Sequence, residues 1–429
     1  APRGHTDGPM KRFGIFLGLA WRGVRRQSRR SLLTATAMVL GLALLIFTRA
    51  LADGGHEDWI DAGVRMGSGH VVVQAPGFRT SRDIGDRIPG TLLPQISDAL
   101  GTAGVSEYIL ARSDRVEVQG LANSASGAVP VMIVGVDPTQ EIEYGTVHDG
   151  PVEGRYLEPG DRLQAYVGAA LAERLGLHVG SRLVLSAQDA TGEIAGQFVR
   201  VVGIFETGLP ALDQGLVHIP LPTAQSWLAM GPDLTSVALV LHSSFVVEDV
   251  TAILTAALER GELDVLGWRE SMPELDSAVR IDDYGDYVFH TILFVIIALA
   301  IVNTILMSVF YRTREFGVLR AMGLTKGQTA SIVFLEGVIL TCISGIVGIV
   351  LGYSFTWIFF RNGLDFSAFW SEDFEIAGTV IDPIIVPVFR LAQLKQSIVL
   401  IFTVGILASL YPSYRATQID VAEAMKFEE

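Results

Sequence analysis

The chain has 429 residues, of which 50% are hydrophobic and 18% are charged, and its formal net charge at pH 7 is −14. This composition is too apolar for an ordinary soluble protein and predicts a membrane protein with a large water-exposed part. The single cysteine excludes an internal disulfide and a thiolate metal site, and the acidic balance argues against nucleic acid as a partner.

The N-terminal part of the chain is basic. Residues 1–9 precede Met10-Lys11-Arg12, which reads as a natural start, so we expect them to be an artificial or disordered extension. Residues 10–30 hold seven Lys or Arg and no acid, and their apolar residues recur at helical spacing, which predicts an amphipathic helix on the cytoplasmic membrane face. Residues 31–52 form the first predicted span, because their apolar run is too long for a signal peptide.

Residues 53–286 contain no run long enough to span a membrane and predict one extracytoplasmic domain. They carry 14 arginines, no lysine and 34 acids, a net formal charge of −20. Strand-like runs such as 70–74 and 237–242 alternate with helical segments such as 169–175, so a mixed α+β fold is expected. Its size allows two subdomains, with one inserted at about 138–222. Both ends of the domain are predicted to continue the adjoining spans as helices.

The remaining chain predicts three further spans. These are residues 287–310, 332–360 and 391–411, separated by a basic loop at 311–331 and an outer loop at 361–390 and followed by a tail at 412–429. The basic loop holds four Lys or Arg against one acid, and a short positive loop is kept inside. The expected fold is therefore an α-helical membrane protein with four transmembrane helices, cytoplasmic termini and a large α+β domain inserted between helices 1 and 2.

The basic loop carries the most distinctive sequence motif. Residues 312–328 read RTREFGVLRAMGLTKGQ, FLEG and a glycine-spaced helix follow, and the pattern predicts a short helix along the inner membrane face. A solvated loop that only sets topology is the alternative. The wording resembles the FtsX-like permease domain of type VII ABC transporters, in which this segment is the coupling helix that docks on the ATPase. The resemblance assigns this contact to six residues: Arg314, Glu315, Gly317, Arg320, Ala321 and Gly323.

Two passages of the outer domain extend the resemblance. GRYLEPGD at 154–161 and VVGIFETGLPALDQGLVHIPL at 201–221 are similar to lipoprotein-releasing permeases of the LolC and LolE type. The resemblance implies a subunit of the bacterial inner membrane with a periplasmic domain. Its implied partners are two ATPase subunits, a second permease that is identical or paralogous, membrane lipids, and a periplasmic carrier or adaptor that receives lipoprotein substrates.

The sequence contains none of the catalytic or nucleotide-binding motifs that we searched for. The phosphate-binding pattern GxxxxGK followed by Ser or Thr is missing, as are HExxH and GxSxG. We therefore expect no catalytic residue, no metal and no cofactor in this chain, and ATP with Mg²⁺ to be used by the partner ATPase.

A lipid-accepting cavity is expected between the first and second spans at the interface of two permeases. Candidate lining residues are Met38, Leu42, Leu45, Phe289 and Ile292. Other functions stay open: a MacB-like efflux permease of a tripartite pump, which normally has its ATPase fused at the N-terminus, an FtsX-like regulator of cell-wall hydrolases, which would have a smaller outer domain, or a membrane-anchored structural domain without an ATPase.

Overall fold

The computed structural model describes residues 18, 22, 28–149, 151–258, 262–367, 375–376, 379–380 and 384–419. The predicted extension at 1–9, most of the amphipathic helix predicted at 10–30 and the last ten residues of the predicted tail lie outside this range, and residues 28–30 belong to the first long helix. The chain divides into two compact units: a membrane unit of residues 1–55, 282–364 and 385–429, and an outer-domain unit of residues 56–281 and 365–384.

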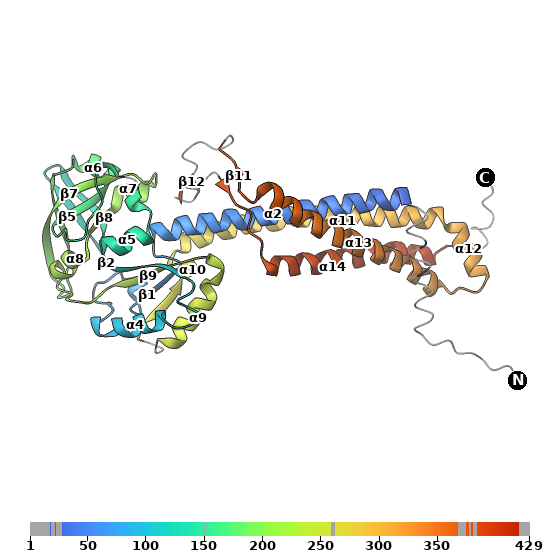
Figure 1. The fold of residues 1–429 in the computed structure, drawn as a ribbon, viewed down its shortest axis with the longest axis horizontal. Coiled ribbons are helices and arrows are strands. Elements are labelled where there is room, and N and C mark those ends of the chain that lie inside the picture. Colours follow the sequence, from blue (N-terminus) through green and yellow to red (C-terminus); the bar gives the residue numbers. More distant parts are fainter. Residues whose placement is uncertain are drawn as a thin grey trace. The chain divides into compact units, whose positions relative to one another are not determined.

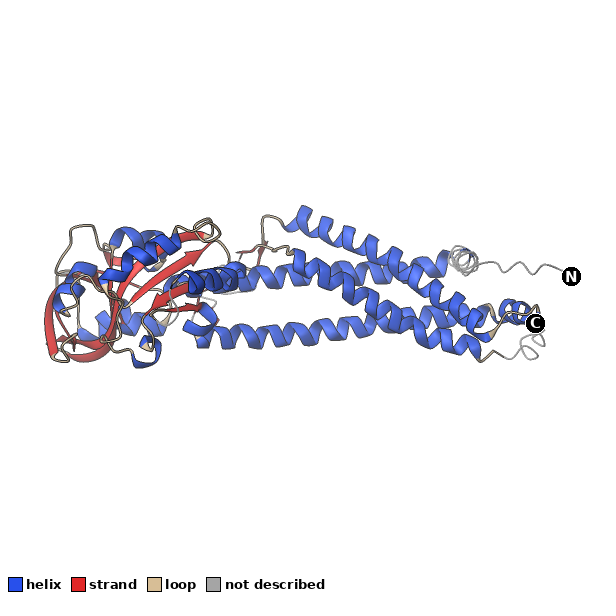
Figure 2. Cartoon of the chain, turned by 90° about the horizontal axis from the view of Figure 1, so that it is seen from below, coloured by secondary structure: helices blue, strands red, loops and turns tan. Residues whose placement is uncertain are grey.

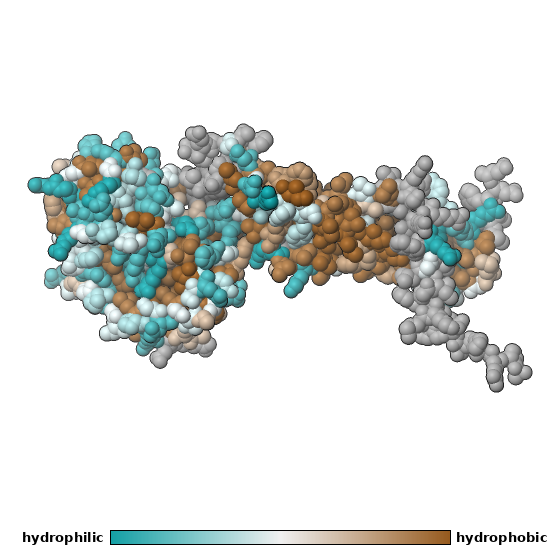
Figure 3. Space-filling model, viewed as in Figure 1, coloured by the Kyte–Doolittle hydropathy of each residue, from teal (hydrophilic) through white to brown (hydrophobic). Residues whose placement is uncertain are grey.

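Long helices make up the membrane unit (Figure 1). Four are long and apolar enough to cross a membrane, which confirms the predicted fold class: α2 (Ser28–Met66), α11 (Pro273–Tyr311), α13 (Lys326–Phe360) and α14 (Leu391–Thr417). Hydrophobic residues cover this part of the chain on the face shown in Figure 3. Helices α2 and α11 both continue beyond the predicted spans, α2 as far as Met66 and α11 from Pro273 onward.

Small residues on α13 let the neighbouring helices approach closely. A Cβ atom added to Gly352 would lie 3.0 Å from the Cα atom of Ala43 on α2, and one added to Gly348 would lie 2.9 Å from a methyl carbon of Leu42. Gly337 faces Ser409 of α14 in the same way. Close backbone approach through small residues is typical of membrane helices, because lipid gives no hydrophobic drive for helix association.

The outer-domain unit is built on one large sheet (Figure 2). Among the described residues its strands follow the order β10-β1-β9-β2-β3-β8-β5-β7-β4, and β6 pairs with β2 and β7. The strands are β1 (Val71–Gln74), β2 (Ile109–Ser124), β3 (Gly127–Val136), β4 (Pro151–Gly154), β5 (Gln164–Gly168), β6 (Arg182–Gln188), β7 (Ile194–Phe205), β8 (Leu216–Pro220), β9 (Ser236–Leu241) and β10 (Asp264–Gly267).

Short helices connect these strands, and a few short elements complete the chain. The helices of the domain are α3 (Phe78–Ser81), α4 (Leu93–Leu100), α5 (Pro138–Tyr144), α6 (Ala169–Leu175), α7 (Pro210–Gly215), α8 (Leu221–Trp227), α9 (Val247–Ala257) and α10 (Trp268–Ser271). Two-residue strands lie in the predicted outer loop: β11 (Leu364–Asp365), β12 (Glu375–Ile376), β13 (Thr379–Val380) and β14 (Ile384–Ile385).

The sheet is the hydrophobic core of the domain. All six residues of β9 are buried, because the strand pairs with β1 on one side and β2 on the other and its alternate side chains pack in core clusters on both faces of the sheet. Ile96 of α4 and Leu254 of α9 belong to the same buried cluster as Leu239 of β9, so these helices cover the sheet. The strands of the predicted insertion, β4 to β8, occupy one end of the strand order, but β8 pairs with β3 of the flanking part. The division into two subdomains therefore stays a prediction.

A buried polar cluster holds the end of α2 to the sheet. Arg115 of β2 donates a hydrogen bond of 2.7 Å to the carbonyl oxygen of Gly67, and the Tyr144 hydroxyl donates one of 2.9 Å to the same oxygen. Arg115 also forms a buried ion pair of 2.6 Å with Glu141 of α5, which accepts a further hydrogen bond from Ser113. Burial opposes ionisation of Glu141, but Arg115 and the Ser113 hydroxyl hold its pKa below the ordinary value.

Candidate functional site

The basic loop folds into helix α12 (Thr313–Ala321) between α11 and α13. Gly323 lies just after α12 and has a φ of +104°, a backbone conformation that residues other than glycine rarely adopt. Two residues later Thr325 begins α13 with a capping box: its hydroxyl accepts from the Gln328 N–H, and the Gln328 side chain accepts from the Thr325 N–H. The turn between α12 and α13 is therefore defined at both of its ends.

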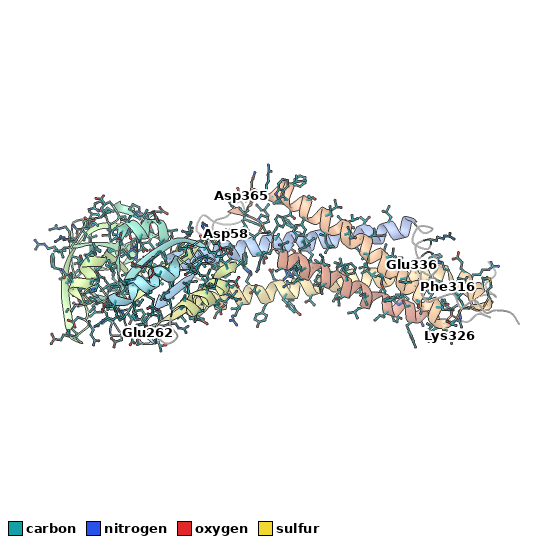
Figure 4. All side chains as sticks on the ribbon, turned by 60° about the horizontal axis from the view of Figure 1, so that its bottom comes forward. Asp58, Glu262, Phe316, Lys326, Glu336 and Asp365 are labelled. Carbon is teal, nitrogen blue, oxygen red and sulfur yellow. The ribbon has the colours of Figure 1, made fainter. Side chains whose placement is uncertain are left out.

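One aromatic side chain anchors α12 to the membrane unit. Phe316 is completely buried, in a cluster that contains Val309 of α11, Val333 of α13 and Ala416 of α14. Figure 4 shows Phe316 at the same end of the membrane unit as Glu336. Because three of the spanning helices contribute to this cluster, a displacement of α12 would disturb the packing of all three.

A polar clamp reinforces this anchor. Arg312, at the junction of α11 and α12, lies 2.9 Å from a carboxylate oxygen of Glu336 on α13 and 3.0 Å from one of Glu315 on α12. The Ser308 hydroxyl of α11 donates to the other Glu336 oxygen at 3.1 Å. The Arg312 guanidinium also lies over the Phe316 ring, 5.0 Å from its centroid. One arginine thus joins α11, α12 and α13.

The opposite face of α12 is exposed and mostly apolar. Arg314, Val318, Ala321 and Met322 lie on it at helical spacing, and Val318 and Met322 are 43% and 71% exposed. We call these four residues the α12 ridge. An apolar ridge with one cation suits insertion into a groove of another protein, since exposed apolar side chains in contiguous patches mark interaction surfaces. Sequence reasoning missed Val318 and Met322, although their spacing from Arg314 was visible.

The structure separates the six predicted coupling residues. Arg314, Ala321 and Gly323 are exposed, whereas Gly317 is buried on the inner face of α12. Glu315 and Arg320 are half-buried and bond within the chain: Glu315 pairs with Arg312, and Arg320 donates to the carbonyl oxygen of Ile419. Their contacts fit a role in holding α12, while the exposed residues are available to a partner.

The five candidate cavity residues do not share one surface. Met38, Leu42 and Leu45 are buried in the packing of the four long helices. Phe289 and Ile292 of α11 are 48% and 56% exposed. Helix rotation explains the difference, because the exposed side of α2 carries other residues, such as Leu40 and Leu44. Within the described part of the chain, no group of three His, Cys, Asp or Glu side chains is arranged to hold a metal ion.

Comparison with known proteins agrees with this arrangement. Residues 31–257 match the MacB-like periplasmic core domain, and residues 287–421 match the FtsX-like permease C-terminal domain. The chain therefore belongs to the family of ABC transporter permeases that combine these two domains. It is a multi-pass membrane protein with an α+β extracytoplasmic domain between the first helix and the later ones.

Three relatives illustrate its range within the family. It is 25% identical to "Lipoprotein-releasing system transmembrane protein LolC" of Neisseria meningitidis serogroup B over 75% of this chain and 79% of that protein. LolC of Xylella fastidiosa is 24% identical over 96% of this chain and 98% of its own length. "Macrolide export ATP-binding/permease protein MacB" of Rhodospirillum rubrum is 24% identical over 79% of this chain, which covers 52% of that protein.

Proposed function

We propose that the chain is the membrane subunit of a transporter that couples ATP hydrolysis by a separate ATPase to work outside the membrane. The observation that carries this proposal is the α12 ridge, exposed on a helix that Phe316 and Arg312 fix to three spanning helices. A partner that pushes on the ridge would move those helices as a group. ATP and Mg²⁺ would be bound by the ATPase, and this chain would supply contacts rather than catalytic groups.

Lipoproteins are the cargo that we propose, and the work is their release from the membrane. It is supported by similarity to LolC over nearly the whole length of both chains. In this proposal the protein lies in the bacterial inner membrane with its termini in the cytoplasm. It pairs with a second permease and two ATPase subunits and passes lipoproteins to a periplasmic carrier. Export of the macrolide type is the second candidate, because the chain is also similar to MacB, of which it covers 52%.

Docking through the α12 ridge can be tested by charge insertion. Val318→Asp and Met322→Asp should each lower the amount of ATPase that co-purifies with the chain, because a carboxylate would enter an apolar contact. We expect at least about a tenfold loss of affinity, or about 1.4 kcal/mol. Val184→Asp is the matched control, since Val184 is a similarly exposed valine of the outer domain, at 37%. Normal co-purification of both ridge variants would contradict the docking role.

The cargo can be tested with photo-crosslinkers at the two exposed cavity candidates. A crosslinker at Phe289 or Ile292 should capture acylated lipoprotein and not its unacylated form, because these side chains face outward from α11. A crosslinker at the buried Leu42 is the control and should capture neither. Capture of a macrolide probe in place of lipoprotein would favour the export function.

A further inference from the structure

An extended segment lies against the outer part of helix α2. It consists of residues 385–390, which directly precede α14. The Val388 N–H donates a hydrogen bond of 2.9 Å to the carbonyl oxygen of Ala50 on α2. The Arg390 side chain lies 3.8 Å from a carboxylate oxygen of Asp53, one turn further along the same helix. We call residues 385–390 the α2 strap.

Gly54 is the point at which the strap comes closest to α2. The carbonyl oxygen of Val386 lies so near the Gly54 backbone that an added Cβ atom would overlap it, and the Val386 carbonyl carbon would be only 2.9 Å away. Gly55 is a matched contrast, because a Cβ atom added there would lie 3.6 Å from a methyl carbon of Ile385, an ordinary contact. Position 54 therefore accepts only glycine while the strap is in place, whereas position 55 has room for alanine.

The strap joins α2 to two further spanning helices. Its Phe389 ring packs against Tyr353 of α13, with the ring centroids 5.1 Å apart, and its last residue leads directly into α14. One turn before Ala50, Ile46 of α2 packs in a buried cluster that contains Tyr353 and side chains of α14. Ile46, Ala50 and Gly54 are spaced by four residues and so lie on one face of α2. The strap continues the packing of this face against α13 and α14.

The strap supports α2 at a locally weak point. The predicted first span ends at residue 52, and α2 continues without a break to Met66. Gly54 and Gly55 follow each other just beyond that span, and adjacent glycines lower helix propensity and favour a kink. An external contact at these residues therefore holds α2 where it would bend most easily.

We propose that the α2 strap stays closed on α2 while the transporter works, so that the outer part of α2 moves together with α13 and α14. Gly54 is the positioning residue that admits the strap. Helix α12 is anchored to α13 and α14 through Phe316, so a push on the α12 ridge would reach the outer part of α2 through the strap. The inference rests on the proposed coupling function and is independent of the cargo.

Alanine substitutions at the two glycines test the strap. The full chain, co-expressed with its ATPase and carrying Cys342→Ala, receives Ala50→Cys as a reporter, because Ala50 is buried on the strap face of α2. Gly54→Ala should raise the rate of labelling by a membrane-impermeant maleimide about 5- to 150-fold, which corresponds to the usual cost of overpacking. Gly55→Ala should leave the rate unchanged. No increase with Gly54→Ala, or the same increase with Gly55→Ala, would overturn the proposed closure.

A covalent link tests whether the strap stays closed during turnover. In the Cys342→Ala background, Asp53→Cys and Arg390→Cys are joined by a short bis-maleimide, which replaces the ion pair. The effect of the permease on ATP turnover should be the same before and after this crosslink. Each single-cysteine variant, treated with the same reagent, is the control. Loss of the effect in the crosslinked pair alone would show that the strap must open and would overturn the proposal.

The two assays separate failure of this inference from failure of the proposed function. Labelling of Ala50→Cys needs no ATP turnover, so it judges the closed strap by itself. A permease that never affects ATP turnover, even without a crosslink, would instead contradict the coupling function, which the ridge variants test separately.

Discussion

Arg312 is the residue through which the candidate site is joined to the helices. Its charge is shared between Glu336 and Glu315 at 2.9 and 3.0 Å, and its side chain is largely buried. The buried charges of Arg312 and Glu336 are stable only together, because each would otherwise lose its hydration without compensation. The pair therefore fixes geometry more than it adds stability.

Breaking this pair gives a prediction at the same scale. Arg312→Met leaves the Glu336 carboxylate buried without its cation and should lower stability by about 3 to 5 kcal/mol. The purified complex should show a lower Tm. The permease should also change the rate of ATP turnover by the ATPase less than the wild-type permease does. The double variant Arg312→Met with Glu336→Leu removes both charges and should recover much of the Tm. If the single variant unfolds at the wild-type temperature, the clamp has no structural role.

Two buried histidines predict how stability of the outer domain depends on pH. Burial lowers the pKa of His70 and of His218 to about 4. In the unfolded chain both titrate near 6.5, so between pH 6.5 and 4 the unfolded state binds more protons than the folded state. Stability should be complete above pH 6.5 and fall by up to about 1.4 kcal/mol per histidine for each pH unit below it. The depressed pKa of Glu141 acts in the same direction at lower pH.

Denaturant unfolding of the whole chain between pH 7.5 and 4.5, followed by the fluorescence of the domain's tryptophans, measures this slope. His218→Phe should flatten it, because one of the two titrating groups is lost. His178→Gln is the control: this histidine is exposed in the same domain, and its replacement should leave the slope unchanged. A wild-type slope of zero across this interval would contradict the prediction.

At the scale of elements, the cluster around Arg115 joins helix α2, strand β2 and helix α5. The single variant Arg115→Met removes one hydrogen bond to the end of α2 and leaves the buried Glu141 carboxylate without its cation, so it should cost about 3 to 5 kcal/mol of folding free energy. Arg115→Met with Glu141→Leu should restore most of this loss, which equilibrium unfolding in urea can measure. Additive losses in the double variant would show that the two side chains act independently.

Elements with a strong periodic pattern could be predicted from the sequence. The four spanning helices follow from long apolar runs, strand β1 follows from three consecutive valines, and β9 follows from a short apolar run. Helix α6 was also expected at its observed position. Helix α5 was not expected, because its seven residues have no apolar periodicity and depend on Pro138 and on the Asp137 side chain, which accepts from the Thr139 N–H.

The candidate site was predicted in part, for a physical reason. The sequence motif predicted the short helix that became α12, but a motif does not tell which side of a short helix is buried. That side is set by Phe316 and by Glu336, which lies beyond the turn of the hairpin, and such contacts between distant residues leave no local pattern. For the same reason Met38, Leu42 and Leu45 were expected at a cavity and are buried in the helix packing.

For the whole molecule, the decisive prediction is topology. Ile194 of the outer domain is 84% exposed, and Lys326 is exposed at the start of α13. In a Cys342→Ala background, Ile194→Cys should react with a membrane-impermeant maleimide added outside cells whose outer envelope has been opened. Lys326→Cys should react only after the inner membrane is permeabilised, since we expect a short basic loop to be kept inside. Labelling of Lys326→Cys from outside would reverse the orientation and exclude docking of a cytoplasmic ATPase.

The unbroken course of α2 and α11 sets a rule for their lengths. Each helix has 39 residues and passes from the membrane unit into the outer-domain unit without a break. One residue inserted into an α-helix turns everything beyond it by about 100° and lifts it by about 1.5 Å. A single residue inserted after Ile60 of α2 would therefore turn Val64 out of the core in which Trp59 and Ile60 are packed, so the length of this helix is fixed by its own packing.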